Sequence, residues 1–480
     1  MTQEQPSLRA AAARGAAWSG LSTIVLRLGG LVVGIILARI LAPEQFGVYA
    51  VALTVQGILL TVADLGLSAD LIRSDDPRRI APTVATLGLL SGTTLAILTM
   101  TTSGMLADVL GSPDAAPAIA VLSLTLFFGG ASVVPFAMLS RRFQQRELFF
   151  VGAADFVVST TVTLALVGLG FGVMGLAVGR VAAQLVSSTM QFILAREVPR
   201  FGIDRVMLRP VLAFGLPIAA ANLLSWALLN VDNIVLARVA GATALGYYVL
   251  AFNISSWPMS ALSQMVRSIS LPYFSRTGQS SEGLASVTAI AWAVALPAGG
   301  VLAVLSAPVI NVVYGEKWMP AAPVLAALGL YGSLRVVFDI FAGYLYARGR
   351  SKPVLWIQIA WLVVLVGGMI VATTQFGILG AAWVHVAVAV VIILPIYLLV
   401  LRAAGVHVGE IVRALWWPTL GAVGAIATAF AVHALISESL PALLAGGFAA
   451  VAVWAAIMWP WARRRLAEIR RTRAVAAEVS

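Results

Sequence analysis

Fourteen apolar stretches, each about 20 residues or more, follow one another along this 480-residue chain and are separated by short charged segments. A helix of that length crosses a hydrocarbon core of about 30 Å. Because no water hydrates the backbone there, only helices or a closed barrel can span it, and the lack of strict alternation favours helices. With 60% apolar and 11% charged residues, the chain has too little polar surface to be a soluble globular protein. The sequence predicts an all-α polytopic membrane protein with spans near 17–40, 46–69, 80–103, 116–138, 150–169, 172–195, 210–237, 243–268, 285–307, 321–346, 354–374, 377–401, 412–434 and 440–461.

The distribution of basic residues predicts the orientation. An even number of spans puts both termini on one side, and the positive-inside rule identifies that side as the cytoplasm. With the termini inside, 24 of the 31 Lys and Arg residues fall in inner segments and three in outer loops. This asymmetry also accounts for the net charge of +11 without a nucleic-acid partner.

Two segments of the chain repeat. The segment 36–49 recurs at 235–248, an offset of 199, and 171–181 recurs at 376–386, an offset of 205. A duplicated half in so apolar a chain is typical of transporters with two related bundles and a substrate path between them. The expected organisation is an N-terminal tail (1–16), an N-terminal bundle (17–200), a C-terminal bundle (201–402), two additional spans (403–461) and a basic tail (462–480).

Several kinds of chemistry have no support in the sequence. The chain has no cysteine, no GxxxxGK[ST] phosphate loop and no HExxH motif, and its three histidines are far apart. No outer loop is long enough to form a catalytic domain. We therefore expect a secondary transporter rather than an enzyme, with no metal and no cofactor. A proton or a sodium gradient could drive it, and the sequence leaves both open.

Four arginines fall inside the spans: Arg27, Arg180, Arg267 and Arg335. A charge near the bilayer centre costs at least about 2.5–3.5 kcal/mol, so each is a candidate functional group, here for an anionic substrate. Arg27 lies on a stripe of small and polar residues at steps of three and four, with Gly20, Thr23, Gly30 and Gly34. Arg267 ends a similar polar face with Asn253, Ser256, Ser260 and Ser263, although its place near the inner end also permits snorkelling to the headgroups.

Four carboxylates accompany these arginines: Asp64, Asp155, Asp232 and Asp339. Carboxylates in membranes bind protons or sodium, which makes them candidates for ion coupling, and they also neutralise arginines. Asp339 follows Arg335 by four residues, so a structural ion pair is an alternative for both. Arg180 aligns with His385 in the second repeat, so each half presents a basic group at that level.

Motifs concentrated in the first 75 positions carry a family resemblance. These are Gly15-Ala-Ala-Trp18-Ser-Gly, the segments 38–49 and 64–73, and Arg141-Arg142-Phe143 further on. With fourteen spans in two halves, the chain resembles the Wzx-type polysaccharide flippases of the multidrug/oligosaccharidyl-lipid/polysaccharide exporter superfamily. Within it, the chain is most similar to the branch that exports colanic-acid-like and other exopolysaccharide repeat units.

The resemblance implies a V-shaped pair of six-helix bundles with two peripheral spans, working by alternating access in the bacterial plasma membrane. It implies an undecaprenyl-pyrophosphate-linked oligosaccharide as substrate, and a polysaccharide polymerase and chain-length machinery as partners. Related lipid II flippases rely on arginines in the first and eighth spans, a role that Arg27 and Arg267 would share at the level of the span. Two alternatives stay open: a cation-coupled multidrug exporter, favoured by Asp232 and Trp416-Trp417, and a membrane enzyme or assembly subunit of polysaccharide synthesis.

Overall fold

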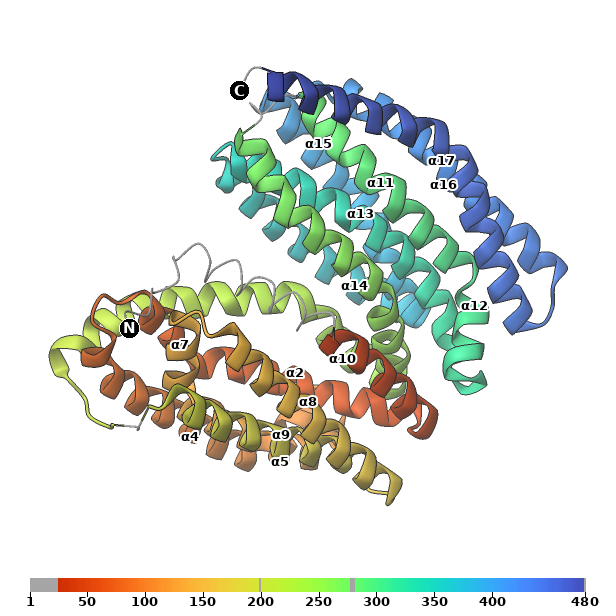
Figure 1. Ribbon diagram of the computed structural model, residues 1–480. Helices are drawn as coiled ribbons and strands as arrows, with labels where there is room; N and C mark the ends of the chain where they lie inside the picture. Colours follow the sequence, from red (N-terminus) through yellow and green to blue (C-terminus); the bar gives the residue numbers. More distant parts are fainter. Residues whose placement is uncertain (1–24, 198–199, 277–280, 479–480) are drawn as a thin grey trace, which may run out of the picture. The chain divides into compact units, whose positions relative to one another are not determined.

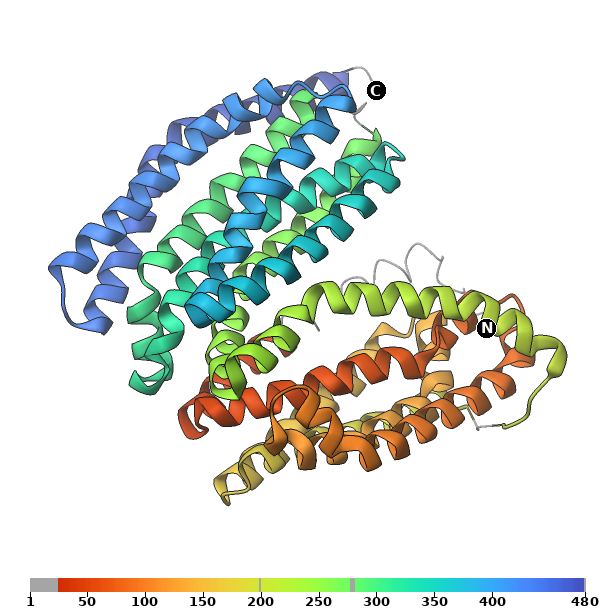
Figure 2. The same cartoon turned by 180° about the vertical axis from the view of Figure 1, so that it is seen from behind.

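The computed structural model describes residues 25–197, 200–276 and 281–478, and every regular element within them is a helix (Figures 1 and 2). Twelve of these helices are long and apolar enough to cross a membrane. The prediction of an all-α, multi-pass membrane protein is therefore confirmed. The longest of the twelve, over residues 351–403, is interrupted at Gly377, and a further helix over residues 25–40 precedes them. The count of fourteen spans stays a prediction compatible with this arrangement.

The chain forms two compact units, Met1–Gly246 and Tyr247–Ser480. The first contains the helix 25–40 and then α2 (Pro43–Asp64), α3 (Leu67–Arg73), α4 (Pro77–Val109), α5 (Ala116–Leu122), α6 (Leu124–Ala131), α7 (Val133–Arg141), α8 (Gln145–Gly168) and α9 (Gly172–Ala195). Helix α10 (Arg205–Arg276) runs from the first unit into the second. The second unit continues with α11 (Ser281–Val304), α12 (Ser306–Val309), α13 (Ala322–Ala347), α14 (Ser351–Val388), α15 (Leu394–Ala403), α16 (Val408–Leu435) and α17 (Ser439–Glu478).

The predicted second span, 46–69, is wrong at its C-terminal end. Helix α2 stops at Asp64 because Leu65 and Gly66 adopt positive φ angles of 49° and 70°, after which the short helix α3 begins. At Gly66 the chain passes close to α10, since a Cβ there would lie 2.3 Å from the carbonyl oxygen of Gly215. The break leaves Asp64 at the end of a helix rather than in its middle.

The predicted separation of the seventh and eighth spans takes a different form in the structure. The range of α10 comprises two helices that meet at a kink at Gly241, whose backbone is non-helical, with φ 83° and ψ 172°. Only glycine adopts this conformation readily, so one residue replaces the expected loop. The predicted spans 354–374 and 377–401 are likewise joined without a loop, and they meet at a kink at Gly377, where φ is 60°.

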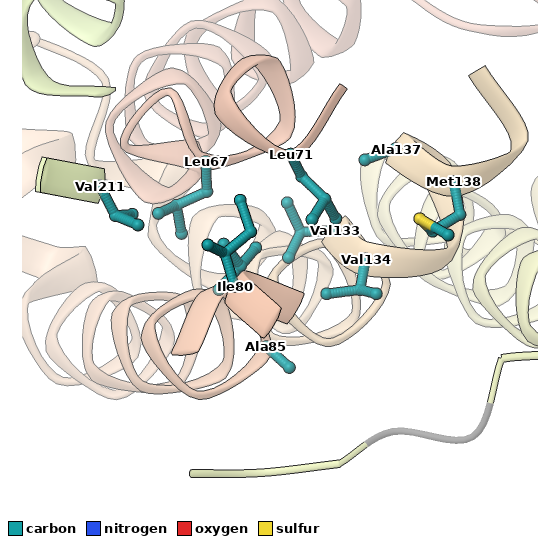
Figure 3. Close-up of a cluster of buried hydrophobic side chains, with 10 residues drawn as sticks. Leu67, Leu71, Ile80, Ala85, Val133, Val134, Ala137, Met138 and Val211 are labelled. Carbon is teal, nitrogen blue, oxygen red and sulfur yellow. The ribbon is translucent and has the colours of Figure 1, made fainter. Parts of the chain in front are cut away.

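A buried apolar cluster joins four helices of the first unit (Figure 3). Leu67 and Leu71 of α3 face Ile80 of α4 and Val133 of α7, and Val211 of α10 completes the cluster. Leu67 and Leu71 are fully buried, and burying a leucine side chain contributes roughly 1.5–3 kcal/mol. The cluster therefore holds the short helix α3, and with it the break after Asp64, in a fixed place.

The first pair of repeated segments meets inside the first unit. Gly47 and Gly246 occupy equivalent positions in the two copies. A Cβ on Gly47 would lie 1.6 Å from the carbonyl oxygen of Ala242, and one on Gly246 would lie 1.9 Å from that of Pro43. The two copies thus cross at their glycines, each against the other's backbone, which is what a symmetric contact between repeats requires.

Candidate functional site

A cavity of about 660 Å³ lies inside the first unit, between the helix 25–40, α2, α7, α8 and α9. We call it the α8–α9 cavity, because those two helices pack side by side and supply most of its polar side chains (Figure 1). Its volume is within the usual range of ligand-binding pockets. The polar residues that line it are Tyr49, Asp155, Ser159, Thr160, Thr163, Arg180, Gln184, Ser187 and Gln191.

Two charged side chains in this cavity form an ion pair. Nη1 of Arg180 on α9 donates to both carboxylate oxygens of Asp155 on α8, at 3.0 and 3.3 Å. The two side chains stay 35% and 26% exposed, so a ligand in the cavity can reach them. A guanidinium has five N–H donors, and Nη1 alone bonds Asp155 here, so Arg180 keeps capacity for an anionic oxygen.

The polar side chains of α9 form a stripe that sequence reasoning missed. Arg180, Gln184, Ser187 and Gln191 recur at steps of four, three and four, which places them on one face of the helix. The same stepping had identified the stripe around Arg27, so the signal was present in the sequence. The stripe shows that Arg180 belongs to a polar wall and is not an isolated charge.

The stripe continues into a second, smaller cavity of about 180 Å³, which we call the Asp64 cavity. Asp64 lines it together with Gln184 and Gln191, and these two glutamines also line the α8–α9 cavity. Ser68 donates a hydrogen bond to Asp64 at 3.1 Å. The structure therefore connects Asp64 and Asp155, two of the four predicted carboxylates, through one polar face of α9.

Arg27 lies on the helix that closes the α8–α9 cavity from another side. It is half-buried, and by helical spacing it shares a face with Gly30 and Gly34, which line the cavity. A Cβ on either glycine would meet no heavy atom within 4 Å, so both border open space. Gly20 and Thr23, the other members of the predicted stripe, fall outside the described residues.

Arg335 and Asp339 line a separate cavity of about 200 Å³ in the second unit. They lie on α13 and face Ser256 and Ser263 of α10, two members of the polar face expected on the eighth span. Arg267 itself lies on α10, but its side chain is outside the described part of the structure. The direct ion pair between Arg335 and Asp339 stays a prediction.

Asp232 is the one predicted carboxylate that none of these cavities includes. Its side chain is 5% exposed, and one carboxylate oxygen accepts a hydrogen bond of 3.0 Å from the backbone N–H of Asn233. A side chain so enclosed has less access to a substrate than Asp155. His385, which the repeat aligns with Arg180, is also buried, and its Nδ1 lies 2.9 Å from the carbonyl oxygen of Ala381.

These features define a class: a polytopic helical membrane protein with an internal repeat and charged, ligand-sized cavities within its bundles. The family follows from the sequence comparison. The model of the polysaccharide biosynthesis protein family matches residues 36–323, more than half of the chain, so the chain belongs to that family.

Two curated relatives and one solved structure extend this result. The chain is 29% identical to the lipopolysaccharide biosynthesis protein WzxC of Escherichia coli over 358 residues, covering 72% of this chain and 71% of WzxC. It is 26% identical to the succinoglycan biosynthesis transport protein ExoT of Rhizobium meliloti over 328 residues, covering 67% and 66% of the two chains. Its fold is similar to that of the lipid II flippase MurJ in an inward closed conformation, with a TM-score of 0.78, 13% identity, and 94% and 100% of the two chains covered.

Proposed function

We propose that this protein translocates undecaprenyl-pyrophosphate-linked oligosaccharide repeat units across the bacterial plasma membrane by alternating access. Both termini lie in the cytoplasm, and the units delivered to the outer face pass to a polysaccharide polymerase and its chain-length machinery. Membership of the polysaccharide biosynthesis family supports this proposal, as do relatives named for lipopolysaccharide biosynthesis and succinoglycan transport.

The single observation that carries the proposal is the α8–α9 cavity. A pyrophosphate has to give up water when it enters the membrane, and charge-assisted hydrogen bonds from arginine offset that cost. Arg180 lines the cavity, and Arg27 lies on the helix that closes it. Hydroxyl and amide groups on α8 and α9 supply the donors and acceptors that sugar hydroxyls need.

The Arg180–Asp155 pair links substrate binding to an ion gradient. Asp155 and a substrate phosphate compete for the same guanidinium, because both are acceptors for its N–H groups. A proton or a sodium ion on Asp155 weakens its hold on Arg180 and leaves the guanidinium to the phosphate. Release of that ion restores the pair and expels the phosphate, so binding of the ion and binding of the phosphate favour each other.

Reconstitution in liposomes tests the proposal. Purified protein is placed in liposomes that carry a fluorescent polyprenyl-pyrophosphate oligosaccharide, and an external quencher reports how much of it crosses the membrane. We expect protein-dependent translocation that Arg27→Ala reduces at least roughly tenfold and that Arg27→Lys restores poorly, because lysine cannot form the bidentate contact with phosphate. Translocation by Arg27→Ala at the wild-type rate, with equal protein incorporated, would remove Arg27 from the path.

The driving ion is tested in the same liposomes. Imposed proton and sodium gradients are compared for wild type and Asp155→Asn, with Asp232→Asn as the matched carboxylate outside the cavities. We expect Asp155→Asn to lose the dependence on the gradient and Asp232→Asn to keep it. No translocation of the lipid-linked sugar under either gradient, together with efflux of cationic drugs, would overturn the proposed substrate class.

A further inference from the structure

A third cavity of the first unit, of about 890 Å³, has a different composition from the α8–α9 cavity. It lies where the first turns of α4 and α7, the start of α8 and the last turn of α9 come together, and we call it the basic cavity. Four arginines line it, against two glutamates: Arg78, Arg142, Arg196 and Arg200, and Glu147 and Glu197. Its apolar lining residues include Ala81, Val134, Pro135 and Phe192.

One of the four arginines is engaged in holding the cavity together. Arg142 forms an ion pair with Glu197, and its Nη1 donates at 2.8 Å to the carbonyl oxygen of Ala195 at the end of α9. Arg142 and Glu197 therefore fix the chain that leaves α9 and neutralise each other. No described acidic side chain lies within ion-pair distance of Arg78, Arg196 or Arg200, so these three leave an unbalanced positive charge at the rim.

The cavity lining also includes an uncharged polar residue, Gln144. Oε1 of Gln144, at the start of α8, is buried and has no hydrogen-bond partner within the described part of the chain. Because Gln144 lines the cavity, its amide group is an uncharged polar partner for a ligand hydroxyl. A ligand that fits the cavity thus combines an anionic phosphate for the arginines with a hydroxyl for Gln144.

The outer side of α9 indicates where the rest of such a ligand would lie. Val178, Leu185 and Ile193 recur at steps of seven and eight, so they share one face, and they are 38%, 47% and 67% exposed. This apolar stripe leads along a candidate membrane span directly to the basic cavity, which Ile193 lines. An acyl or prenyl chain packed on the stripe would place its headgroup among the arginines.

We propose that the basic cavity binds the headgroup of a phosphate-bearing membrane lipid, with the phosphate at Arg78, Arg196 and Arg200 and a headgroup hydroxyl at Gln144. Basic residues that only fix topology need no cavity and no adjoining apolar stripe. Two lipids share this chemistry: a resident hydroxyl-bearing phospholipid such as phosphatidylglycerol, and the pyrophosphate-linked sugar lipid of the proposed function. The site itself does not depend on that function, and only the second source rests on it.

The test measures lipid binding to the purified full-length protein by native mass spectrometry, with phosphatidylglycerol, phosphatidic acid and phosphatidylcholine as probes. The double variant Arg196→Gln/Arg200→Gln removes two rim charges. The matched control Arg205→Gln/Arg209→Gln removes two exposed charges at the start of α10 that do not line the cavity. We expect wild type and control to bind phosphatidylglycerol alike, and the double variant to bind it at least roughly tenfold more weakly. Equal losses in both double variants would reduce the effect to general charge attraction and overturn the proposal.

A second variant tests the acceptor separately from the charge. Gln144→Leu keeps every arginine but removes the amide oxygen. We expect wild type to prefer phosphatidylglycerol over phosphatidic acid, which lacks the headgroup hydroxyls, and Gln144→Leu to lose that preference while still discriminating against phosphatidylcholine. An unchanged preference would remove Gln144 from the site.

Competition distinguishes the two sources. Undecaprenyl pyrophosphate is added to the complex with phosphatidylglycerol. Displacement that depends on Arg196 and Arg200 identifies the cavity as a waiting site for the transported lipid, whereas a failure to displace identifies a phospholipid site. Either result leaves the headgroup site in place, and translocation in liposomes, measured separately, reports on the proposed function.

Discussion

Arg180 and His385 occupy the same position in the two repeats and have opposite surroundings. Each follows a Phe-Gly-x-x-Gly turn, and in both copies the second glycine packs on the last turn of the preceding helix, Gly175 against Val167 and Gly380 against Ala372. Yet Arg180 is part of an ion pair in a cavity of about 660 Å³. His385 is 3% exposed, with the ring centroids of Tyr331 and Tyr248 at 5.0 and 6.3 Å.

The difference comes from the neighbours and not from the backbone. At the repeat offset of 205, the position of Asp155 is taken by Ala360. Asp155 supplies a carboxylate beside Arg180 in the first repeat, while in the second a methyl group takes its position and aromatic rings enclose His385. Duplication preserved the framework, and substitutions at these neighbouring positions made the two copies chemically different.

The largest effect is expected where the framework is shared. Gly47→Val and Gly246→Val each place a side chain on a backbone oxygen that lies within 2 Å of the new Cβ, at 1.6 and 1.9 Å respectively. Because backbone cannot yield as a flexible side chain can, we expect almost no folded protein from either variant. The measurement is the amount of monodisperse protein extracted from membranes. Gly104→Ala in α4, where nothing lies within 4 Å, is the control and should be extracted at the wild-type level.

Substitution of the two basic groups tests the difference between the repeats most directly. Arg180→Gln removes the guanidinium and leaves Asp155 without its ion-pair partner, so we expect translocation to fall at least roughly tenfold. His385→Gln keeps a group that can hydrogen-bond the Ala381 carbonyl, and we expect translocation within about twofold of wild type and a melting temperature lower by a few degrees. Both are measured in liposomes and by thermal unfolding.

The double variant Asp155→Asn/Arg180→Gln separates charge balance from function. Arg180→Gln leaves the Asp155 charge unpaired, so we also expect it to lower the amount of folded protein. The double variant should recover that amount, since no charge is left unpaired, without recovering translocation. Equal losses of translocation in Arg180→Gln and His385→Gln would contradict the functional asymmetry between the repeats.

A smaller effect is expected when a side chain fills part of the α8–α9 cavity. Gly34→Leu directs a side chain into the α8–α9 cavity without a clash, because nothing lies within 4 Å of its Cβ. We expect normal amounts of folded protein and roughly three- to tenfold slower translocation, because the substrate loses space in a pocket of ligand size. Gly367→Leu in the second unit, also without neighbours within 4 Å, is the matched control. Translocation that survives Gly34→Leu unchanged would place the substrate elsewhere.

Much of the fold could be predicted because hydrophobic length is a local property. The apolar stretches identified the helices, and the echo of 36–49 at 235–248 revealed the repeat. The interruptions were harder to predict: the break after Asp64 and the single-residue break at Gly241 depend on backbone angles that hydropathy does not encode. The sequence showed that Gly47 and Gly246 are equivalent positions of the repeat, but it did not show that the two glycines meet.

For the site, the sequence by itself determined which charges enter the membrane and which helix face each one occupies. A charge in a membrane span is costly and therefore rare, so each one stands out in an apolar stretch. It did not determine their partners. Only the tertiary structure decided that Arg180 meets Asp155, that the polar stripe of α9 connects them to Asp64, and that Asp232 lies apart from these cavities. The physical reason is that a pairing depends on which helices pack side by side, and that is set by shape and volume at glycines and small residues far from the charges.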